Sequence, residues 1–319
     1  MRIAPRLFIL LASMVAITPS IAAEWQSIEA AELQNFDDDD IERHRAVPGY
    51  FAGISIGQTR FSENGFDWHL LRFTHDEKAD GPLWVVPHDD ENAAFDAMME
   101  GLRQYGGTAI VVNTGAASSR RQTGNGLCGI QTFVTSACDP NRNFDYRSPV
   151  FTQAILSGWK PGRPVIALHT NGDGFAGDGA GGRGDITMLD AQAFRRGRVQ
   201  PRKDGHFGIK REPLLDDPDV FAILPYSSKL GISKSEEACR LVLNGRGIHV
   251  WHERVGRSDG SLSNYIVLNR PEIAYVNFEA ERDEDLANGA AAHRLMSDAY
   301  LADCADLWHE PAALPATAR

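Results

Sequence analysis

The sequence predicts an α/β fold with a mixed, mostly parallel central sheet and helices on both faces. Short apolar segments typical of strands alternate with segments of helical periodicity, the pattern of parallel strands joined by helices. The chain of 319 residues is 43% apolar and 24% charged, which is ample for a core and excludes wholesale disorder. Its formal charge of −11 opposes binding to nucleic acid or to acidic lipid surfaces.

The start of the chain has the three regions of a secretory signal peptide. Arg2 and Arg6 precede an apolar run over residues 7–17, and the small residues Ala22 and Ala23 mark a cleavage site. The apolar run is shorter than the ~20 residues that span a bilayer. We therefore expect residues 1–23 to be removed, and the mature protein to be periplasmic or secreted without stable membrane insertion.

The four cysteines are expected to form two disulfides in an oxidising compartment. None of them lies in a C-x-x-C pair. Three pairings are open. A short loop between Cys128 and Cys138 would leave Cys239 to pair with Cys304, and buried thiols are the alternative.

The first strands are expected to form a hairpin followed by a buried strand. Residues 51–58 and 68–73 are short apolar segments that flank the turn sequence Ser62-Glu63-Asn64-Gly65 and are expected to pair. Residues 83–86, Leu-Trp-Val-Val, form an uninterrupted apolar run typical of a strand that is buried on both faces.

Helices and strands then alternate towards the end of the chain. Residues 92–105 carry apolar side chains at helical spacings of three and four, and a Gly-Gly pair follows them. A strand at 109–112 leads into a long polar loop at 113–147. The remaining expected elements are helices at 149–157 and 235–243, a C-terminal helix, and strands at 164–168, 221–224, 248–251 and 273–278.

Two histidines and a glutamate follow the expected strands in a way that suits a metal ion. His88 and Glu91 are three residues apart in a turn that enters a helix, and His169 ends another strand. Two imidazoles and one carboxylate form the donor set of catalytic zinc sites, which keep a fourth position for water. The alternative is that Glu91 only stabilises a helix N-terminus and that both histidines are structural.

A carboxylate at the end of an apolar strand, Glu279, is a candidate general base. An unpaired charge there costs several kcal/mol to bury, so the group must be paired, protonated or functional. A glutamate beside a zinc-bound water is suited to take its proton and pass it to a leaving amine. Glu281, two residues later on the same strand face, is a competing candidate.

The polar loop contains arginines that suit a substrate carboxylate and a developing oxyanion. Arg142 is flanked by Asn141 and Asn143, and its planar fork would grip a carboxylate with two hydrogen bonds. Arg120 and Arg121 lie earlier in the loop, where either would stabilise an oxyanion. The alternative for Arg142 is a surface arginine after an ordinary turn.

Together these segments resemble the zinc metallocarboxypeptidase superfamily related to carboxypeptidase A, as an exported bacterial member. The resemblance extends roughly over residues 51–281, which is most of the expected mature chain, and the Asn-Arg-Asn-Phe element is its most specific part. The matching segments, in chain order, are His88-x-x-Glu91, Asp139-Pro140-Asn141-Arg142-Asn143-Phe144, Leu168-His169-Thr170 and Phe278-Glu279.

The resemblance implies an α/β/α catalytic domain over residues 51–319, after an N-terminal extension at 24–50. It implies one zinc ion per chain and a peptide or N-acyl amino acid as substrate. The expected periplasmic location, independently of the resemblance, favours murein peptides as that substrate. The implied site residues are zinc ligands His88, Glu91 and His169, general base Glu279, carboxylate-binding Asn141 and Arg142, and Arg121, or alternatively Arg120, at the scissile carbonyl.

Two functions besides a carboxypeptidase or amidase remain open. One is a deacylase of N-acyl amino acids with the same metal ligands, and the other is a catalytically inactive protein that binds carboxylates. The loop at 253–262 lacks the tyrosine that the family carries there, so the substrate clamp must differ. Tyr265 is the nearest tyrosine that could replace it. Because the loop must then be built differently, the residue near Leu262, where the family has its specificity pocket, does not report which substrate side chain is preferred.

Three charged or glycine-rich stretches lie outside these motifs. The acidic run at 37–40, after a helical pattern at 28–33, is interpreted as a solvated turn or helix end. Residues 172–185, rich in glycine and aspartate, fit a flexible loop at the rim of the site and match no calcium motif. The basic segment at 195–211 would attract an anionic substrate or form a solvated loop.

Overall fold

The computed structural model describes residues 23–29, 31–171, 213–215, 220–281, 286–305 and 307. Residues 1–22 of the expected signal peptide and the stretches 172–185 and 195–211 lie outside the described residues. Among the described residues, no helix is both long and apolar enough to cross a membrane.

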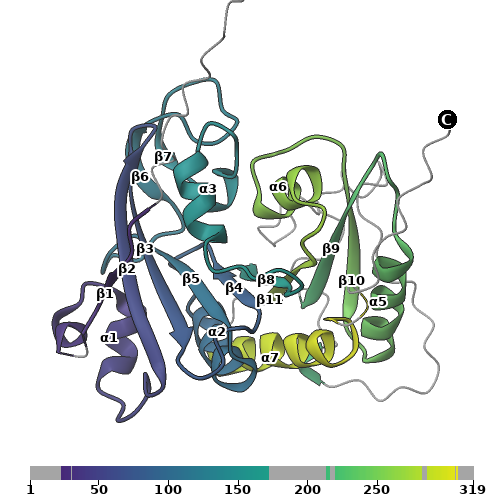
Figure 1. The fold of residues 1–319 in the computed structure, drawn as a ribbon, viewed down its shortest axis with the longest axis horizontal. Helices are drawn as coiled ribbons and strands as arrows, with labels where there is room; N and C mark the ends of the chain where they lie inside the picture. Colours follow the sequence, from purple (N-terminus) through teal and green to yellow (C-terminus); the bar gives the residue numbers. More distant parts are fainter. Residues whose placement is uncertain are drawn as a thin grey trace, which may run out of the picture.

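Eleven strands and six α-helices form the described part of the chain (Figure 1). The strands are β1 (Gln26–Ser27), β2 (Ile54–Glu63), β3 (Phe66–His75), β4 (Leu83–Val86), β5 (Thr108–Asn113), β6 (Gln122–Gly126), β7 (Thr135–Cys138), β8 (Val165–Asn171), β9 (Phe221–Ser227), β10 (His249–Val255) and β11 (Tyr275–Glu281). The helices are α1 (Asp39–Arg45), α2 (Asn92–Tyr105), α3 (Pro149–Leu156), α5 (Lys234–Gly245), α6 (Leu262–Asn269) and α7 (Leu286–Asp303). Short 3-10 helices are η1 (Glu32–Asn35), η2 (Pro140–Arg142) and η4 (Pro213–Leu215).

The strands form one mixed sheet, as the sequence predicts. Their order is β1-β2-β3-β5-β4-β8-β11-β9-β10, and β6 and β7 branch from β3. The four central strands β5, β4, β8 and β11 are parallel, so their carboxyl ends meet at one edge. The flanking pairs β3–β5 and β11–β9 are antiparallel, whereas the edge pair β9–β10 is parallel again.

Helices cover both faces of the sheet and enclose two cores. Figure 1 shows α2 and α7 on one face and α3 and α6 on the other. Side chains alternate along each central strand between these two cores. On β8, Ile166 and Leu168 face α2 and α7, whereas Val165 and Ala167 face α3 and α6.

The expected hairpin is present and is longer than predicted. Strands β2 and β3 pair from Ile54 with His75 to Glu63 with Phe66. Asn64 and Gly65 form the turn with φ of 54° and 87°. Both residues tolerate this left-handed backbone, which matches the twist of a two-residue hairpin. The expected helix at 92–105 is confirmed to the residue.

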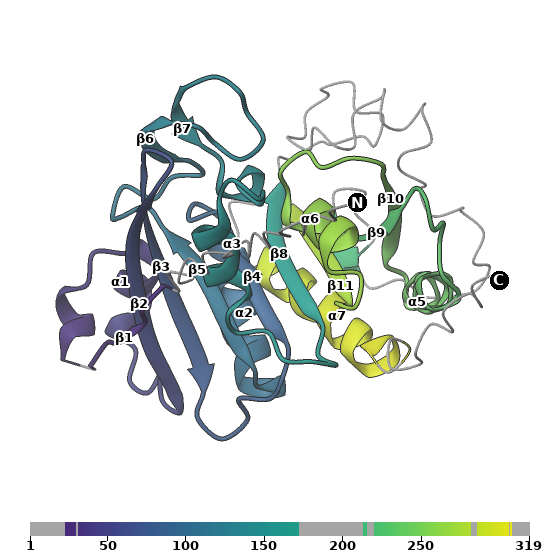
Figure 2. The same ribbon diagram turned by 45° about the horizontal axis from the view of Figure 1, so that its top comes forward.

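Four parts of the fold differ from the predictions. The polar loop at 113–147 contains β6 and β7, whose short polar strands lack an apolar pattern; Figure 2 shows them beyond the β2–β3 hairpin. The helix α6 was not predicted. Residues 28–33 form no α-helix. The acidic run caps and begins α1, and Asp38 and Asp40 are buried rather than solvated.

Residues 24–50, expected as an N-terminal extension, pack on the sheet. Strand β1 pairs with β2, and Ile28, Leu33 and Ile41 are buried in the core shared with α2 and α7. Both disulfides are confirmed: Cys128 pairs with Cys138 and Cys239 with Cys304. The second bond ties α5 to the end of α7.

Candidate metal centre

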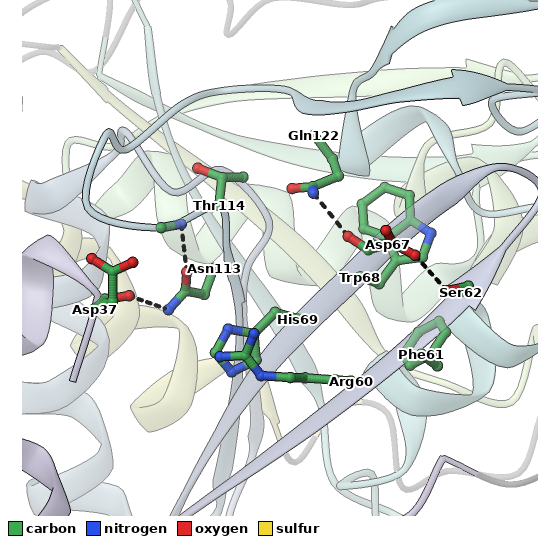
Figure 3. A pocket seen from close by; sticks show the side chains of 11 residues that line it. Asp37, Arg60, Phe61, Ser62, Asp67, Trp68, His69, Asn113, Thr114 and Gln122 are labelled. Carbon is green, nitrogen blue, oxygen red and sulfur yellow. Dashed lines mark hydrogen bonds between the residues drawn. The ribbon is translucent and has the colours of Figure 1, made fainter.

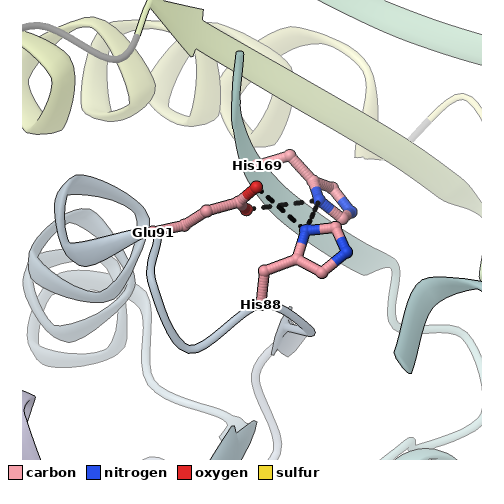
Figure 4. Close-up of side chains that lie close together, drawn as sticks. All are labelled: His88, Glu91 and His169. Atoms are coloured by element: carbon pink, nitrogen blue, oxygen red, sulfur yellow. Dashed lines mark hydrogen bonds and ion pairs between the residues drawn. The ribbon is translucent and has the colours of Figure 1, made fainter. Parts of the chain in front are cut away.

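Three side chains converge at the carboxyl ends of the central strands. His88 follows β4 in a turn whose Glu91 nitrogen donates to the His88 carbonyl at 3.3 Å, and Glu91 caps α2. His169 belongs to β8 itself, one strand away. Figure 4 shows the two imidazoles and the carboxylate pointing towards one another. All three residues are buried.

The separations of their donor atoms fit a tetrahedral metal site. His88 Nδ1 lies 2.9 Å from Glu91 Oε1 and 3.2 Å from His169 Nδ1. His169 Nδ1 lies 3.3 Å from Glu91 Oε2. Ligand atoms at about 2.0–2.1 Å from a tetrahedral zinc ion are roughly 3.3 Å apart. The two imidazole nitrogens and the Glu91 carboxylate, which turns one oxygen towards each histidine, therefore have separations compatible with ligands to one ion.

The pKa values of His88 and Glu91 show how a bound cation would compete with a proton in this cluster. Burial lowers the pKa of His88, but Glu91 and Asp139 outweigh burial and raise it to about 9. Burial also opposes ionisation of Glu91, yet both histidines hold its pKa well below the ordinary value. Metal binding requires a neutral imidazole, so the ion would displace a proton from His88 and bind less tightly in acid.

Asp139, to which the sequence analysis gave no separate role, contacts one of the clustered histidines. Its Oδ1 lies 2.9 Å from His88 Nε2, on the side of the ring opposite the cluster, and also accepts a hydrogen bond from Asn141 N at 2.8 Å. A carboxylate on the second nitrogen fixes the tautomer and orientation of a histidine ligand. In the sequence, the Asp-Pro pair before a polar turn indicates that Asp139 caps a short helix. Its contact with His88 is visible only in the fold.

Glu279 lies beside the cluster on the neighbouring strand. It pairs in register with His169 across the parallel β8–β11 ladder, so both side chains leave the same face of the sheet. Asn277 Nδ2 donates to Glu279 Oε1 at 3.0 Å. Burial and then the Glu91 charge raise the pKa of Glu279 to about 8. Glu281 pairs with Asn171, and its side chain lies outside the described residues.

The structure brings Arg120, rather than Arg121, to the cluster. Arg120 Nη1 donates to Glu91 Oε1 at 2.7 Å. Arg121 is exposed, and its backbone nitrogen donates to Ser119 Oγ at 3.2 Å. The sequence analysis placed Arg121 first and Arg120 as the alternative. The sequence alone cannot decide between them, because the two arginines are adjacent and the path of the loop decides which side chain turns inward.

Asn141 and Arg142 form the wall of the site at η2. Asn141 Nδ2 lies 3.4 Å from His169 Nε2, and its Oδ1 accepts from Leu262 N at 3.2 Å, so its amide links the cluster to α6. Arg142 Nη1 donates to the Asn141 carbonyl at 2.9 Å. Among the described residues, no carboxylate is in ion-pair contact with Arg142. Asn143 supports the loop by accepting from Gly129 N at 3.0 Å.

A buried polar network lies at the start of α6, where a pocket residue was sought. Glu253 accepts hydrogen bonds from Asn264 Nδ2 at 2.7 Å and Ser263 Oγ at 3.1 Å. Burial, followed by the Asp259 charge, raises the pKa of Glu253 to about 7. Tyr265, a residue of α6, packs against the core shared by α3 and α6.

The raised pKa of Glu253 predicts a pH-dependent stability. Glu253 is protonated in both states below its ordinary pKa of 4.5. Between pH 4.5 and about 7 the group ionises only in the unfolded state, and this ionisation stabilises the unfolded chain relative to the folded one. Stability should therefore fall over this range. A Glu253→Gln variant can keep both hydrogen bonds and should be more stable by about 1–3 kcal/mol at pH 8. Denaturant unfolding at pH 4 and pH 8 tests this; an equal difference at both pH values would contradict it.

Apart from the metal cluster, a surface recess lies next to the loop that carries Arg120. Figure 3 shows it between the β2–β3 hairpin and the end of β5. Arg60, His69, Asn113, Thr114 and Gln122 are among its lining residues. Thr114 belongs to both regions, because its hydroxyl group donates to Asp89 at 2.6 Å.

No protein-family model matches this sequence, and no curated protein matches it. Among solved structures, it is similar to a candidate metallopeptidase from Shewanella denitrificans OS217, with 12% identity, a TM-score of 0.35 and coverage of 78% of this chain and 84% of that chain. An aspartoacylase family protein from Mesorhizobium loti gives 11% identity, a TM-score of 0.37 and coverage of 77% and 67%. Thrombin activatable fibrinolysis inhibitor gives 11% identity, a TM-score of 0.37 and coverage of 88% of this chain and 78% of that chain. Similarities this low carry no functional assignment, which must come from the site itself.

Proposed function

We propose that this protein is a zinc-dependent hydrolase of carboxypeptidase or amidase type that cleaves an amide bond near a free carboxylate. One observation carries the proposal: His88 Nδ1, His169 Nδ1 and the Glu91 carboxylate lie 2.9–3.3 Å apart in a buried cluster. Glu279 adjoins His169 on the next strand. Two imidazoles and a carboxylate with a second carboxylate nearby suit metal-assisted hydrolysis better than a purely structural site.

His88, Glu91 and His169 would hold the zinc ion, and Asp139 would hold the His88 ring in position. When bound, zinc would polarise the substrate carbonyl and lower the pKa of a water molecule. The chain's own residues then have to move protons and stabilise charge. Their buried setting strengthens each of these electrostatic effects.

Glu279 is proposed as the general base and then the general acid. Its carboxylate takes a proton from the attacking water as the new C–O bond forms. The same proton then goes to the amide nitrogen as the C–N bond breaks, so the leaving amine departs neutral. The hydrogen bond from Asn277 keeps one oxygen of Glu279 oriented throughout.

Two arginines are proposed to bind negative charge on the substrate. Arg120, which contacts Glu91, would stabilise the oxyanion that develops at the scissile carbonyl. Arg142 would bind the free carboxylate with its planar fork. We assign that role mainly to Arg142, because the Asn141 Nδ2 group, the donor that a carboxylate would need, lies 3.4 Å from His169 Nε2.

The substrate is proposed to be a peptide or an N-acyl amino acid outside the cytoplasm. The signal-peptide pattern of the first 23 residues supports export, and the two disulfides are typical of oxidising compartments. In a periplasm the abundant small peptides come from the cell wall, so murein peptides are the first to test. This preference depends on location alone.

Metal analysis combined with a substrate screen tests the proposal. Protein purified without chelators should contain about one zinc ion per chain, the stoichiometry of a three-ligand catalytic site. It should hydrolyse peptides, wall-derived peptides or N-acyl amino acids, and a chelator should stop the reaction. Comparing these substrate groups separates a peptidase from a deacylase. A protein without stoichiometric metal or hydrolysis would favour a carboxylate-binding protein instead.

The role of Arg142 predicts a selective loss. Arg142→Ala should raise KM for substrates with a free terminal carboxylate by about tenfold to 10²-fold, the effect of losing a charge-assisted pair. Matched amidated peptides should be hydrolysed almost as well by the variant as by the wild type. Steady-state kinetics on both peptide series measure this, and equal losses on both would remove Arg142 from the role.

A further inference from the structure

The turn that supplies two metal ligands also holds the loop that carries Arg120. We propose that Asp89 and Thr114 are positioning residues that fix Arg120 over the metal centre. This inference rests on the proposed function and adds to it a specific support for the oxyanion-stabilising arginine. Asp89 lies between His88 and Glu91 in sequence and has no ligand role of its own.

Asp89 binds the start of the loop through a single carboxylate oxygen. Its Oδ2 accepts from Thr114 N at 2.7 Å and from Thr114 Oγ1 at 2.6 Å. The Asp89 side chain is buried, with 1% of its residue surface exposed. One oxygen thus accepts from both the backbone and the side chain of Thr114. This pair therefore anchors the end of β5 to the turn after β4.

The same contacts extend to the residue before Arg120. Thr114 Oγ1 accepts a hydrogen bond from Ser119 N at 2.8 Å, which closes the loop on itself. Ser118 Oγ donates to the Asp89 carbonyl at 2.6 Å, so the turn holds both ends of the loop. Ser118 has φ of 35°, a left-handed backbone that a serine adopts only when its surroundings hold it there.

Arg120 is otherwise held by few contacts. Its side chain is 36% exposed, and its described ion pair is the 2.7 Å contact with Glu91. A long side chain of this kind loses rotamer freedom when it is fixed, so its placement depends on the backbone that carries it. Displacing a group that acts on the transition state by about 1 Å costs about 10²-fold in rate.

On the opposite side, described contacts of the loop lead away from the metal ligands: Asn113 Nδ2 donates to the Asp37 carbonyl at 3.3 Å, and Gln122 Nε2 donates to the Asp67 carbonyl at 2.8 Å. Thr114 and Gly115 line the open recess of Figure 3, where Gly115 N donates to Asn113 Oδ1 at 2.6 Å. That bond orders the loop within itself and does not tie it to the metal ligands. Among the described contacts, the ligand turn is thus linked to the residues before Arg120 in two ways, from the Asp89 carboxylate through Thr114 to Ser119, and from the Asp89 carbonyl to Ser118.

Two conservative substitutions at Thr114 test the proposal. Thr114→Val keeps the shape of the side chain but removes the hydroxyl group, and Thr114→Ser keeps the hydroxyl group. In the zinc-loaded full-length protein, we expect Thr114→Val to lower kcat by about tenfold to 10²-fold with KM within about twofold, because the arginine acts on the transition state. Thr114→Ser should restore most of the rate. In an Arg120→Ala background, Thr114→Val should cause no further loss.

A second readout does not depend on activity. Phenylglyoxal labels arginines, and mass spectrometry would follow Arg120 relative to Arg294, a partly exposed arginine on α7. Arg120 should be labelled faster in Thr114→Val than in the wild type or in Thr114→Ser. Unchanged labelling and unchanged kcat in Thr114→Val would overturn the proposal, as would additive losses with Arg120→Ala. If the wild type shows no hydrolysis, the proposed function fails, and the labelling still decides whether Thr114 positions Arg120.

Discussion

The His169→Ala variant is expected to lose bound zinc almost completely and to lose all measurable hydrolysis. His169 is one of the three proposed metal ligands, and its Nδ1 lies 3.2 Å from His88 Nδ1 and 3.3 Å from Glu91 Oε2. Two remaining donors cannot hold a catalytic metal as three do, and the buried Glu91 would lose a partner that stabilises its charge. Metal content by mass spectrometry and hydrolysis rates measure the two losses.

A matched variant separates metal loss from general destabilisation. His252 is also a buried histidine, 1% exposed, but it lies on β10 and outside the cluster. His252→Ala should therefore lower the midpoint of thermal unfolding without removing zinc. Retention of one zinc per chain by His169→Ala, in a protein that still folds, would show that the metal is held elsewhere.

Local spacing explains why part of this centre could be predicted from the sequence. His88 and Glu91 are three residues apart at a strand-to-helix turn, and that spacing alone brings the two side chains to one side. His169 and Glu279 were expected at the ends of strands, and parallel strands carry their carboxyl ends to the same edge. The structure refines this picture, because both residues lie within strands β8 and β11 and pair in register.

Contacts between distant loops explain what the sequence could not show. Asp139 reaches His88 across 51 positions, and Asp89 reaches Thr114 across 25. Neither pairing follows from periodicity, since each depends on the path of a loop. The choice between Arg120 and Arg121 has the same origin, because one of two adjacent side chains must turn inward.

The unpredicted elements of the fold have simple physical causes. Strands β6 and β7 are short and polar, and they depend on the Cys128–Cys138 disulfide and on pairing with β3 rather than on an apolar pattern. Helix α6 begins at Leu262, where Ser261 caps the helix and Asn141 accepts from the Leu262 nitrogen. A helix whose start depends on a residue so far away in sequence has a weak local signal.

The Glu279→Gln variant should keep its zinc and lose at least ~10²-fold in kcat, the scale at which a proton-transferring group contributes. Glutamine has the same shape, and its carbonyl oxygen can still accept the hydrogen bond from Asn277. What disappears is the carboxylate that takes the proton from water. Since Glu279 is not among the three ligands, metal content should remain at the wild-type level.

The dependence of the rate on pH provides a second test of the role of Glu279. Burial and Glu91 raise the pKa of Glu279 to about 8 in the metal-free protein, and a bound cation would favour the ionised form and move that pKa down. A general base acts only when ionised, so the wild-type rate should rise with pH through this ionisation. Glu279→Gln should lose that rising limb. A variant with full activity and an unchanged limb would transfer the role to another carboxylate, with Glu281→Gln as the next measurement.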